Sequence, residues 1–453
     1  MTFFSFLRTN KEFYPLLLKI SLPIIIQGFV STSLIFVDVL MIGQLGKEAI
    51  AAVGLGNQFM LIYLLILNGI ASGVGIFASQ YWGRRYVKHI RDTLGIGLRY
   101  GIGIGVVFTI ITSFFSITIM KFYTPDTIVQ ELGSHYLFLI GLSCIFFAVT
   151  SVYAAILRST KLVMLPLISS IIALALNTLL NFGLVLGHFG FPQLGVTGAG
   201  IALLVARAVE CLIIVITIKI REIPTIINVR SVFLHRSFQH KKFFKVTLPV
   251  IIHSTGWVLG VTIYTKIYAS IGTLAYAAIN ISDTLEKMGI MIFVGIGNAC
   301  AIMLGNAIGA GRQDLAYDYG KKFLFISITG SWIVGVFLIL IRHPVISLYE
   351  LDAEGVHTVS MLIIMMASVM WLKSANIIFN GGILRSGGDT QFSMMLDIGG
   401  VWLIGAPLGI LAAFYLQLPI YYVTPFIYTE ELVKTILGFY RFRTGKWLKN
   451  LTE

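Results

Sequence analysis

The chain has 453 residues, of which 57% are hydrophobic and only 12% are charged, and its formal net charge is +13. A soluble globular domain has about 25% charged residues, so this chain has too few charges to cover a water-exposed surface of its size. The composition therefore excludes a soluble enzyme and indicates a protein embedded in a lipid bilayer.

The positive charge does not indicate a nucleic-acid-binding protein. Lys and Arg occur in short clusters between apolar stretches, a pattern that orients membrane proteins. No basic segment has interleaved aromatic residues that could stack on bases. We therefore expect the lipid bilayer, and no nucleic acid, as a partner of this chain.

Twelve apolar runs predict an all-α, polytopic membrane protein, because a helix needs about 20 apolar residues to cross a bilayer. The first six runs lie at roughly 14–42, 49–82, 92–120, 128–157, 163–187 and 195–218. The second six lie at roughly 243–268, 274–308, 316–341, 356–384, 391–416 and 418–440.

The two sets of six runs have related sequences. A shift of 226 positions aligns Lys19, Leu22, Pro23, Gly46 and Gly69 with Lys245, Leu248, Pro249, Gly272 and Gly295. Repeats of six spans have the same orientation, so we expect two lobes related by a pseudo-twofold axis along the membrane normal. The predicted parts are an amino-terminal lobe at 1–218, a cytoplasmic linker at 219–242, a carboxyl-terminal lobe at 243–440 and a basic cytoplasmic tail at 441–453.

The distribution of Lys and Arg predicts a multi-pass protein of the inner (cytoplasmic) membrane with both termini in the cytoplasm. Half of the connections between runs carry most of the basic residues, and the alternate connections hold only Lys47, Lys121 and Arg342. Short cytoplasmic loops are enriched in Lys and Arg.

The sequence lacks the motifs of common catalytic and nucleotide-binding sites. It has no GxxxxGK[ST] phosphate loop, no HExxH metal motif and no GxSxG nucleophile elbow. We therefore expect no enzyme activity, no cofactor and a transporter driven by an ion gradient. Gly101, Gly103 and Gly105 lie inside an apolar run, which favours close helix packing over phosphate binding.

Asp38 is the most informative ionisable residue in the apolar runs. A charge at the centre of a transmembrane helix costs roughly 2.5–3.5 kcal/mol, and no basic residue lies within one helical turn of Asp38. A lone carboxylate that faces the interior of a helix bundle suits a proton or a hard cation such as Na⁺. Hydration near the end of the span is the alternative explanation.

Asn177 and Asn181 lie four residues apart in the fifth run and share one helix face. Their amide oxygens could ligate a cation or bind a protonated acid, and the alternative is a hydrogen bond between helices. With Asp38 they form the predicted cation-coupling site, and the three residues would ligate the metal ion if Na⁺ is the coupling ion.

The sixth and eighth runs contain charges that can neutralise one another. Arg207 and Glu210 are i, i+3 neighbours and predict a self-satisfied pair. In the eighth run Glu286 shares a face with Asp283, and Lys287 is placed to neutralise Asp283 at i+4. This group predicts either an internal ion pair or contact with a solute.

Four further polar residues lie in the runs of the second half. His253 and Lys373 are candidates for the wall of a cavity. Lys266 and Asp397 lie near the ends of their runs, so their side chains are expected to snorkel toward the membrane surface.

Several short segments follow one another along the chain in a recognisable order. They are Pro23 with Gln27, Val37-Asp38, Met41 to Gly46, Ala51 to Gln58, Gln80 with Gly83, Gly195 to Ala199, Gly309 to Arg312, and an Ile-Leu-Arg-Ser segment present in both halves. Together with the twelve spans they resemble the multidrug and toxic compound extrusion (MATE) transporters over essentially the whole chain.

The resemblance implies two six-helix lobes around a central cavity. It also implies alternating-access antiport of organic, cationic or amphipathic compounds against Na⁺ or H⁺, which would be the coupling ion. Asp38 matches the family's first-helix aspartate and Asn177 its fifth-helix asparagine, while Asn181 stands where some members have an aspartate.

The second half departs from the family pattern. Other members have a glutamate after the equivalent of Pro249, where this chain has His253, and Lys373 stands near the place of their tenth-helix aspartate. The resemblance therefore favours coupling through Asp38, and it leaves open whether the carboxyl-terminal lobe binds a cation. The residues expected to contact solute or line its cavity are Gln27, Asp283, Glu286, His253 and Lys373.

Two other functions stay open from the sequence. A flippase for lipid-linked sugars, with a related fold, would need clustered cationic residues to hold pyrophosphate, and Lys266, Lys287 and Lys373 are the ones available. A membrane-embedded enzyme or receptor is the second alternative. We expect a monomer that acts on a small-molecule substrate.

Overall fold

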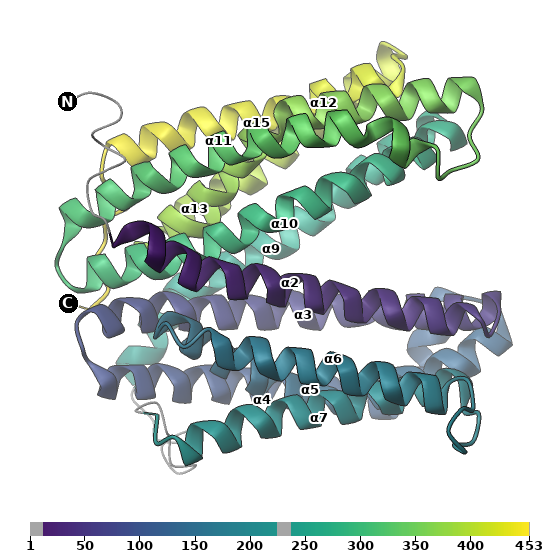
Figure 1. Ribbon diagram of the computed structural model, residues 1–453, viewed down its shortest axis with the longest axis horizontal. Helices are drawn as coiled ribbons and strands as arrows, with labels where there is room; N and C mark the ends of the chain where they lie inside the picture. Colours follow the sequence, from purple (N-terminus) through teal and green to yellow (C-terminus); the bar gives the residue numbers. More distant parts are fainter. Residues whose placement is uncertain (1–11, 224–236, 453) are drawn as a thin grey trace. The chain divides into compact units, whose positions relative to one another are not determined.

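The computed structural model describes residues 12–223 and 237–452 (Figure 1), and these residues form helices and no strand. Before the gap lie α2 (Phe13–Gly43), α3 (Lys47–Gly83), α4 (Val87–Tyr123), α5 (Thr127–Ser159), α6 (Met164–Leu184) and α7 (Gly195–Ile220). After it lie α9 (Ser237–Ile271), α10 (Thr273–Gly309), α11 (Gln313–Ile346), α12 (Ala353–Ile377), η1 (Ile378–Leu384), α13 (Thr390–Gly399), η2 (Gly400–Gly405), α14 (Ala406–Ile410), η3 (Leu411–Tyr415) and α15 (Ile420–Arg443). Most of the expected linker at 219–242 lies outside the described residues.

Eleven helical segments of the described chain are long and apolar enough to cross a membrane. The twelfth predicted run forms α15, a helix of 24 residues that carries Glu430, Glu431 and Lys434 in its interior. The all-α polytopic fold class is therefore confirmed, and the last run is more polar than the sequence analysis expected.

The described chain divides into two compact units. Among the described residues, the amino unit contains 26–223 and 237–247, and the carboxyl unit contains 12–25 together with 248–452. The boundary falls inside α2 and α9, so the first part of each helix packs in the unit formed by the opposite half of the sequence. The lobe boundaries expected at 218 and 243 stay a prediction.

Side-chain contacts explain this exchange of helix ends. In the carboxyl unit, the Phe13 ring lies 5.0 Å from the ring of Tyr319 and 5.2 Å from that of Phe323. In the amino unit, His240 at the start of α9 lies within hydrogen-bond distance of Arg99, at 3.2 Å. Each helix therefore begins among the side chains of one unit and continues in the other.

The helices of each unit surround one or two central helices. In the amino unit α5 packs against α3, α4 and α7, and in the carboxyl unit α12 packs against α10, α11 and α15. The central helices are consequently the most buried, and polar side chains on their inner faces have protein and not lipid around them.

Wider helical turns interrupt the two spans that follow α11. The segments η1, η2 and η3 are π-helical, and η1 carries Asn380 while η2 begins just after Asp397. Single π-helical turns are frequent at functional sites because they change the direction of side chains along a helix. These turns therefore shape the part of the carboxyl unit where buried polar residues gather.

The glycine run of α4 marks a close contact with α5. A β-carbon added at Gly105 would lie 3.3 Å from the backbone oxygen of Cys144 and from the α-carbon of Ile145, and one at Gly101 would lie 3.4 Å from Val152. A β-carbon at Gly103 would meet nothing within 4 Å. Two of the three glycines thus serve helix packing, as the sequence predicted.

We predict that Gly105→Leu lowers the thermal stability of the detergent-solubilised protein and that Gly103→Leu does not. The added side chain at Gly105 must push the α5 backbone away, and overpacking of this kind costs about 1–3 kcal/mol. The measurement is the midpoint of thermal unfolding of both variants. Equal midpoints for the two leucine variants would contradict the assignment of Gly105 to the α4–α5 contact.

Candidate functional site

The three residues of the predicted coupling site lie together in the amino unit. Asp38 of α2 is buried, with 9% of its surface exposed, and Asn177 and Asn181 of α6 are completely buried. The amide nitrogen of Asn181 donates to Asp38 Oδ1 at 2.5 Å and to Asn177 Oδ1 at 3.0 Å. One amide group therefore links the carboxylate to the second amide across two helices.

The coupling triad, defined as Asp38, Asn177 and Asn181, leaves two buried atoms without a hydrogen-bond partner in the described part of the chain. They are Nδ2 of Asn177 and Oδ1 of Asn181. A half-turn of the Asn181 amide would exchange its oxygen and nitrogen, so that three oxygens from three side chains would face one position. Three oxygens placed in this way would suit a proton or a hard cation.

No basic side chain is ion-paired with Asp38 among the residues that the structure describes. Arg207 is instead paired with Glu210 at 3.0 Å, as the i, i+3 spacing predicted. Arg207 also lies over the ring of Phe147, with 4.2 Å from its guanidinium carbon to the ring centroid. The hydrogen-bond partner of Asp38 is thus the neutral amide of Asn181.

Gln27 belongs to a separate chain of hydrogen bonds in the amino unit. Its amide nitrogen donates to Ser170 Oγ at 3.1 Å, and Ser170 in turn donates to Glu210 at 2.8 Å. Arg158 donates to Gln27 Oε1 at 3.3 Å. The side chain is therefore held by protein partners, and its contact with a solute stays a prediction.

In the carboxyl unit Glu286 of α10 pairs with Lys373 of α12. The ammonium of Lys373 lies 2.6 and 2.8 Å from the two carboxylate oxygens and 3.9 Å from the centroid of the Tyr428 ring. Of the two alternatives for this group, an internal ion pair is present at Glu286, whereas no salt bridge within 4 Å joins Asp283 to Lys287 among the described residues and the Lys287 side chain is exposed. The close partner of an acid on this helix comes from another helix and not from the next turn.

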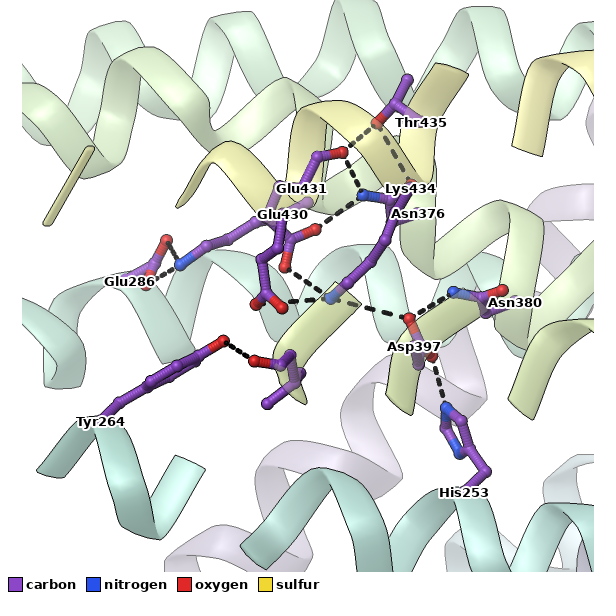
Figure 2. A network of polar contacts seen from close by, with 12 residues as sticks. His253, Tyr264, Glu286, Asn376, Asn380, Asp397, Glu430, Glu431, Lys434 and Thr435 are labelled. Carbon is purple, nitrogen blue, oxygen red and sulfur yellow. Dashed lines mark hydrogen bonds and ion pairs between the residues drawn. The ribbon is translucent and has the colours of Figure 1, made fainter. Parts of the chain in front are cut away.

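Asp397 of α13 lies in the interior of the carboxyl unit with 8% of its surface exposed. It is hydrogen-bonded to His253, and it accepts a hydrogen bond from Asn380 at 2.7 Å (Figure 2). The expectation that Asp397 snorkels is therefore wrong. Its position near the end of an apolar run indicated its depth along the helix but not the inward direction of its side chain.

A charged cluster on α15 was not predicted from the sequence. Lys434 lies 3.4 Å from Glu430, 3.4 Å from Glu431 and 3.7 Å from Asp397. Asn376 donates to Glu431 at 2.6 Å. The sequence did contain an indication of this cluster, because three charged residues within five positions are unusual in an apolar run. The run was assigned as an ordinary membrane span on the basis of its length.

A cavity of about 440 Å³ in the carboxyl unit joins these groups. Four residues predicted to contact solute line it, namely Asp283, Glu286, His253 and Lys373. Its wall also contains five aromatic side chains, which are Trp257, Tyr264, Tyr268, Tyr276 and Tyr428. The volume is within the range of small-molecule sites, and the wall combines these aromatic rings with many charged side chains.

A family model described as MatE matches residues 23–182 and 249–411 of this chain. The chain is 25% identical over 416 residues to the uncharacterized transporter YisQ of Bacillus subtilis. The aligned region covers 91% of this chain and 90% of the relative. The chain is 23% identical over 410 residues to the multidrug resistance protein NorM of Burkholderia vietnamiensis, covering 88% of this chain and 86% of the relative.

Solved structures share the fold. A MATE protein in its bent conformation superposes with a TM-score of 0.87 at 18% identity, covering 95% of this chain and 94% of the other. A point mutant of the Vibrio cholerae MATE transporter VcmN gives a TM-score of 0.87 at 17% identity, covering 96% of this chain and 98% of the other.

We predict that Lys373→Met destabilises the protein by about 3–5 kcal/mol, because it leaves the buried Glu286 carboxylate without a counter-charge. The double variant Glu286→Leu/Lys373→Met should recover most of this loss, since both charges are removed. The measurement is equilibrium unfolding in mixed micelles. Lys287→Met is the matched control and should change the stability by less than about 0.5 kcal/mol; a loss equal to that of Lys373→Met would argue against the ion pair.

Proposed function

Because the chain belongs to the MATE family of multidrug efflux transporters, we propose that it exports organic, cationic or amphipathic compounds in exchange for Na⁺ or H⁺. The members of this family are membrane transporters and not enzymes. The cation would enter from outside, bind at Asp38 and favour the conformation that releases the solute.

The coupling triad carries this proposal. A coupling carboxylate must be buried from lipid and must be able to exchange its cation, so it cannot be locked to a basic neighbour. Asp38 meets both conditions, because it is buried and its partner is the neutral amide of Asn181 at 2.5 Å. Asn177 and Asn181 supply the additional oxygens that a cation would need.

The membrane potential supplies enough free energy to drive such a device. Moving one positive charge inward across 100 mV yields about 2.3 kcal/mol. A difference of this size shifts a two-state equilibrium by well over tenfold. One cation per cycle is therefore sufficient to bias the two conformations that alternating access requires.

The flippase alternative is less well supported. Its pyrophosphate would need free cationic side chains, but Lys373 is paired with Glu286 at 2.6 Å. Lys266 is exposed and does not line the cavity of the carboxyl unit, so that Lys287 is the one of the three lysines that lines it without a recorded salt bridge within 4 Å among the described residues. The charge arrangement of this unit favours an organic cation over a polyanionic lipid headgroup.

The remaining parts of the proposal follow from the sequence. We place the protein in the cytoplasmic membrane with both termini inside, on the basis of the Lys and Arg distribution. We propose that it works as a monomer, because a single chain supplies both halves of the repeat that alternating access needs.

We predict that Asp38→Asn abolishes gradient-driven efflux from proteoliposomes, because the amide cannot take up a proton or balance the charge of Na⁺. Efflux of a panel of organic compounds is measured with Na⁺ and pH gradients imposed separately, which also identifies the coupling ion. Asp126→Asn is the matched control: Asp126 caps α5 through hydrogen bonds at 2.9 and 3.3 Å, a role that Asn fulfils equally well. Normal efflux by the Asp38 variant would remove the mechanism.

A further inference from the structure

Gln27 of α2 belongs to a chain of hydrogen bonds that runs in one direction. Arg158 donates to Gln27 Oε1 at 3.3 Å, and Gln27 Nε2 donates to Ser170 Oγ at 3.1 Å. Ser170 in turn donates to Glu210 at 2.8 Å, and Arg207 balances the charge of this carboxylate at 3.0 Å. A guanidinium can only donate and a carboxylate can only accept. The amide of Gln27 therefore has one orientation, because a half-turn would place its NH2 group against the donor of Arg158.

Two side-chain bridges join α2 to α6 with the same offset. The register bridge is Gln27 with Ser170, and the coupling bridge is Asp38 with Asn181. The two residues of each bridge lie 143 positions apart in the chain, so α2 and α6 run in the same direction there. Eleven residues separate the bridges along both helices, from 27 to 38 and from 170 to 181. Three α-helical turns contain about 10.8 residues and rise about 16 Å, so both bridging residues of a helix project from the same face.

The register bridge fixes how far along α6 the α2 helix lies. Gln27 Nε2 also donates to the backbone oxygen of Pro166 at 3.5 Å, so one amide contacts two residues near the start of α6. Ser170 is 8% exposed and lies on the buried face that also carries Asn181. A slip of one residue along a helix changes the height by about 1.5 Å and the direction by about 100°. Such a slip would break the register bridge and the coupling bridge together.

The carboxyl unit contains an equivalent of the register bridge. The shift of 226 positions places His253 where the amino unit has Gln27, and a shift of 227 places Asp397 where it has Ser170. His253 is hydrogen-bonded to Asp397. Arg385, from the second Ile-Leu-Arg-Ser segment, lies 3.3 Å from the other ring nitrogen of His253, as the arginine of the first such segment lies beside Gln27. A bridge at this position is therefore part of the framework of both units.

The carboxyl unit has other residues at the positions that correspond to the coupling bridge. The same two shifts place Tyr264 where the amino unit has Asp38, and Leu408 where it has Asn181. A tyrosine and a leucine do not provide a carboxylate and an amide. The register bridge therefore forms without a coupling bridge above it, whereas the coupling bridge of the amino unit lies on helices that a register bridge already joins.

From this geometry we propose that Gln27 and Ser170 are positioning residues of the coupling site, because their bridge sets the register in which Asp38 meets Asn181. The ends of the register bridge are held by opposite charges, so it stays closed when the charge of Asp38 changes. The coupling bridge then forms and opens while α2 keeps its place along α6. The inference deepens the proposed coupling function and rests on it for its biological meaning.

The first test measures the register directly, as the distance between two spin labels by electron paramagnetic resonance. The labels are attached through Leu40→Cys and Leu179→Cys, because these side chains are 55% and 59% exposed on α2 and α6. An Asp38→Ala background removes the coupling bridge and defines the parent distance, and no solute is present. Gln27→Met should lower the ratio of molecules at the parent distance to molecules at other distances by about three- to tenfold, the factor that a hydrogen bond contributes. An unchanged distribution would overturn the proposal, and it is the result expected if Gln27 acts only by contact with a solute.

Variants of two serines provide the controls. Ser170→Ala should act in the same direction as Gln27→Met, while Ser170→Thr keeps the hydroxyl and should keep the parent distance. Ser143→Ala is the matched control, because Ser143 is a buried serine of α5 whose hydroxyl donates to Ile140 O in its own helix at 2.6 Å. If Gln27→Met does not fold, Ser170→Ala decides: a distribution equal to that of Ser143→Ala contradicts the proposal.

The second test connects the register to cation binding in protein that keeps Asp38. The midpoint of thermal unfolding is measured against Na⁺ concentration at constant pH and against pH in choline chloride, because a bound cation stabilises the folded protein. The response that Asp38→Asn abolishes belongs to the coupling site. Gln27→Met and Ser170→Ala should raise the cation concentration needed for half of this response by about three- to tenfold, whereas Ser170→Thr and Ser143→Ala should not.

The two tests separate the failure of this inference from a failure of the proposed function. A displaced register with an unchanged cation requirement would show that the bridge has a structural role alone and would reject Gln27 and Ser170 as positioning residues. A parent protein without a response that depends on Asp38 would contradict the proposed coupling function itself, whereas the spin-label distances do not depend on that function.

Discussion

A charged side chain in a bilayer lacks water, so its state depends on the groups that the protein places around it. Two arrangements meet this constraint. Asp38 accepts a hydrogen bond from the neutral amide of Asn181 at 2.5 Å. Other acids face bases, as Glu210 does with Arg207 at 3.0 Å in the amino unit and Glu286 with Lys373 at 2.6 Å in the carboxyl unit. A carboxylate with a neutral partner can be neutralised by binding a cation. A carboxylate that is already paired with a basic side chain can bind another cation only if that cation displaces the basic side chain.

Helix geometry places these groups. Asn177 and Asn181 both lie on the buried face of α6 because four residues make about one helical turn, and the amide of Asn181 links Asn177 to Asp38. In the carboxyl unit the π-helical turns redirect the chain, so that Asn380 of η1 meets Asp397 of α13 at 2.7 Å. The polar site of the amino unit thus depends on the regular α-helical turn of α6, and that of the carboxyl unit depends on the π-helical turns near Asn380 and Asp397.

Prediction from the sequence succeeded where a site depends on one or two neighbouring helices and on residues that are unusual in a membrane span. Asp38, Asn177 and Asn181 could be grouped because each is exceptional in an apolar run, and the structure brings them into contact. It failed for Asp397, which was assigned to a span end. It also overlooked Lys434, because a long apolar run hides a few charges when only its length is considered.

The sequence by itself determined that the protein is embedded in a membrane and that its fold is helical, and it gave the helix bounds to within a few residues. These properties follow from the length and composition of the apolar runs. It also determined which residues are too polar for lipid. The tertiary structure decided which of them meet. Lys373 forms a salt bridge with Glu286, which lies on another helix, while Lys287, one turn away from Asp283, stays exposed. Partner choice depends on the directions in which packed helices turn their side chains, and spacing along one chain does not specify those directions.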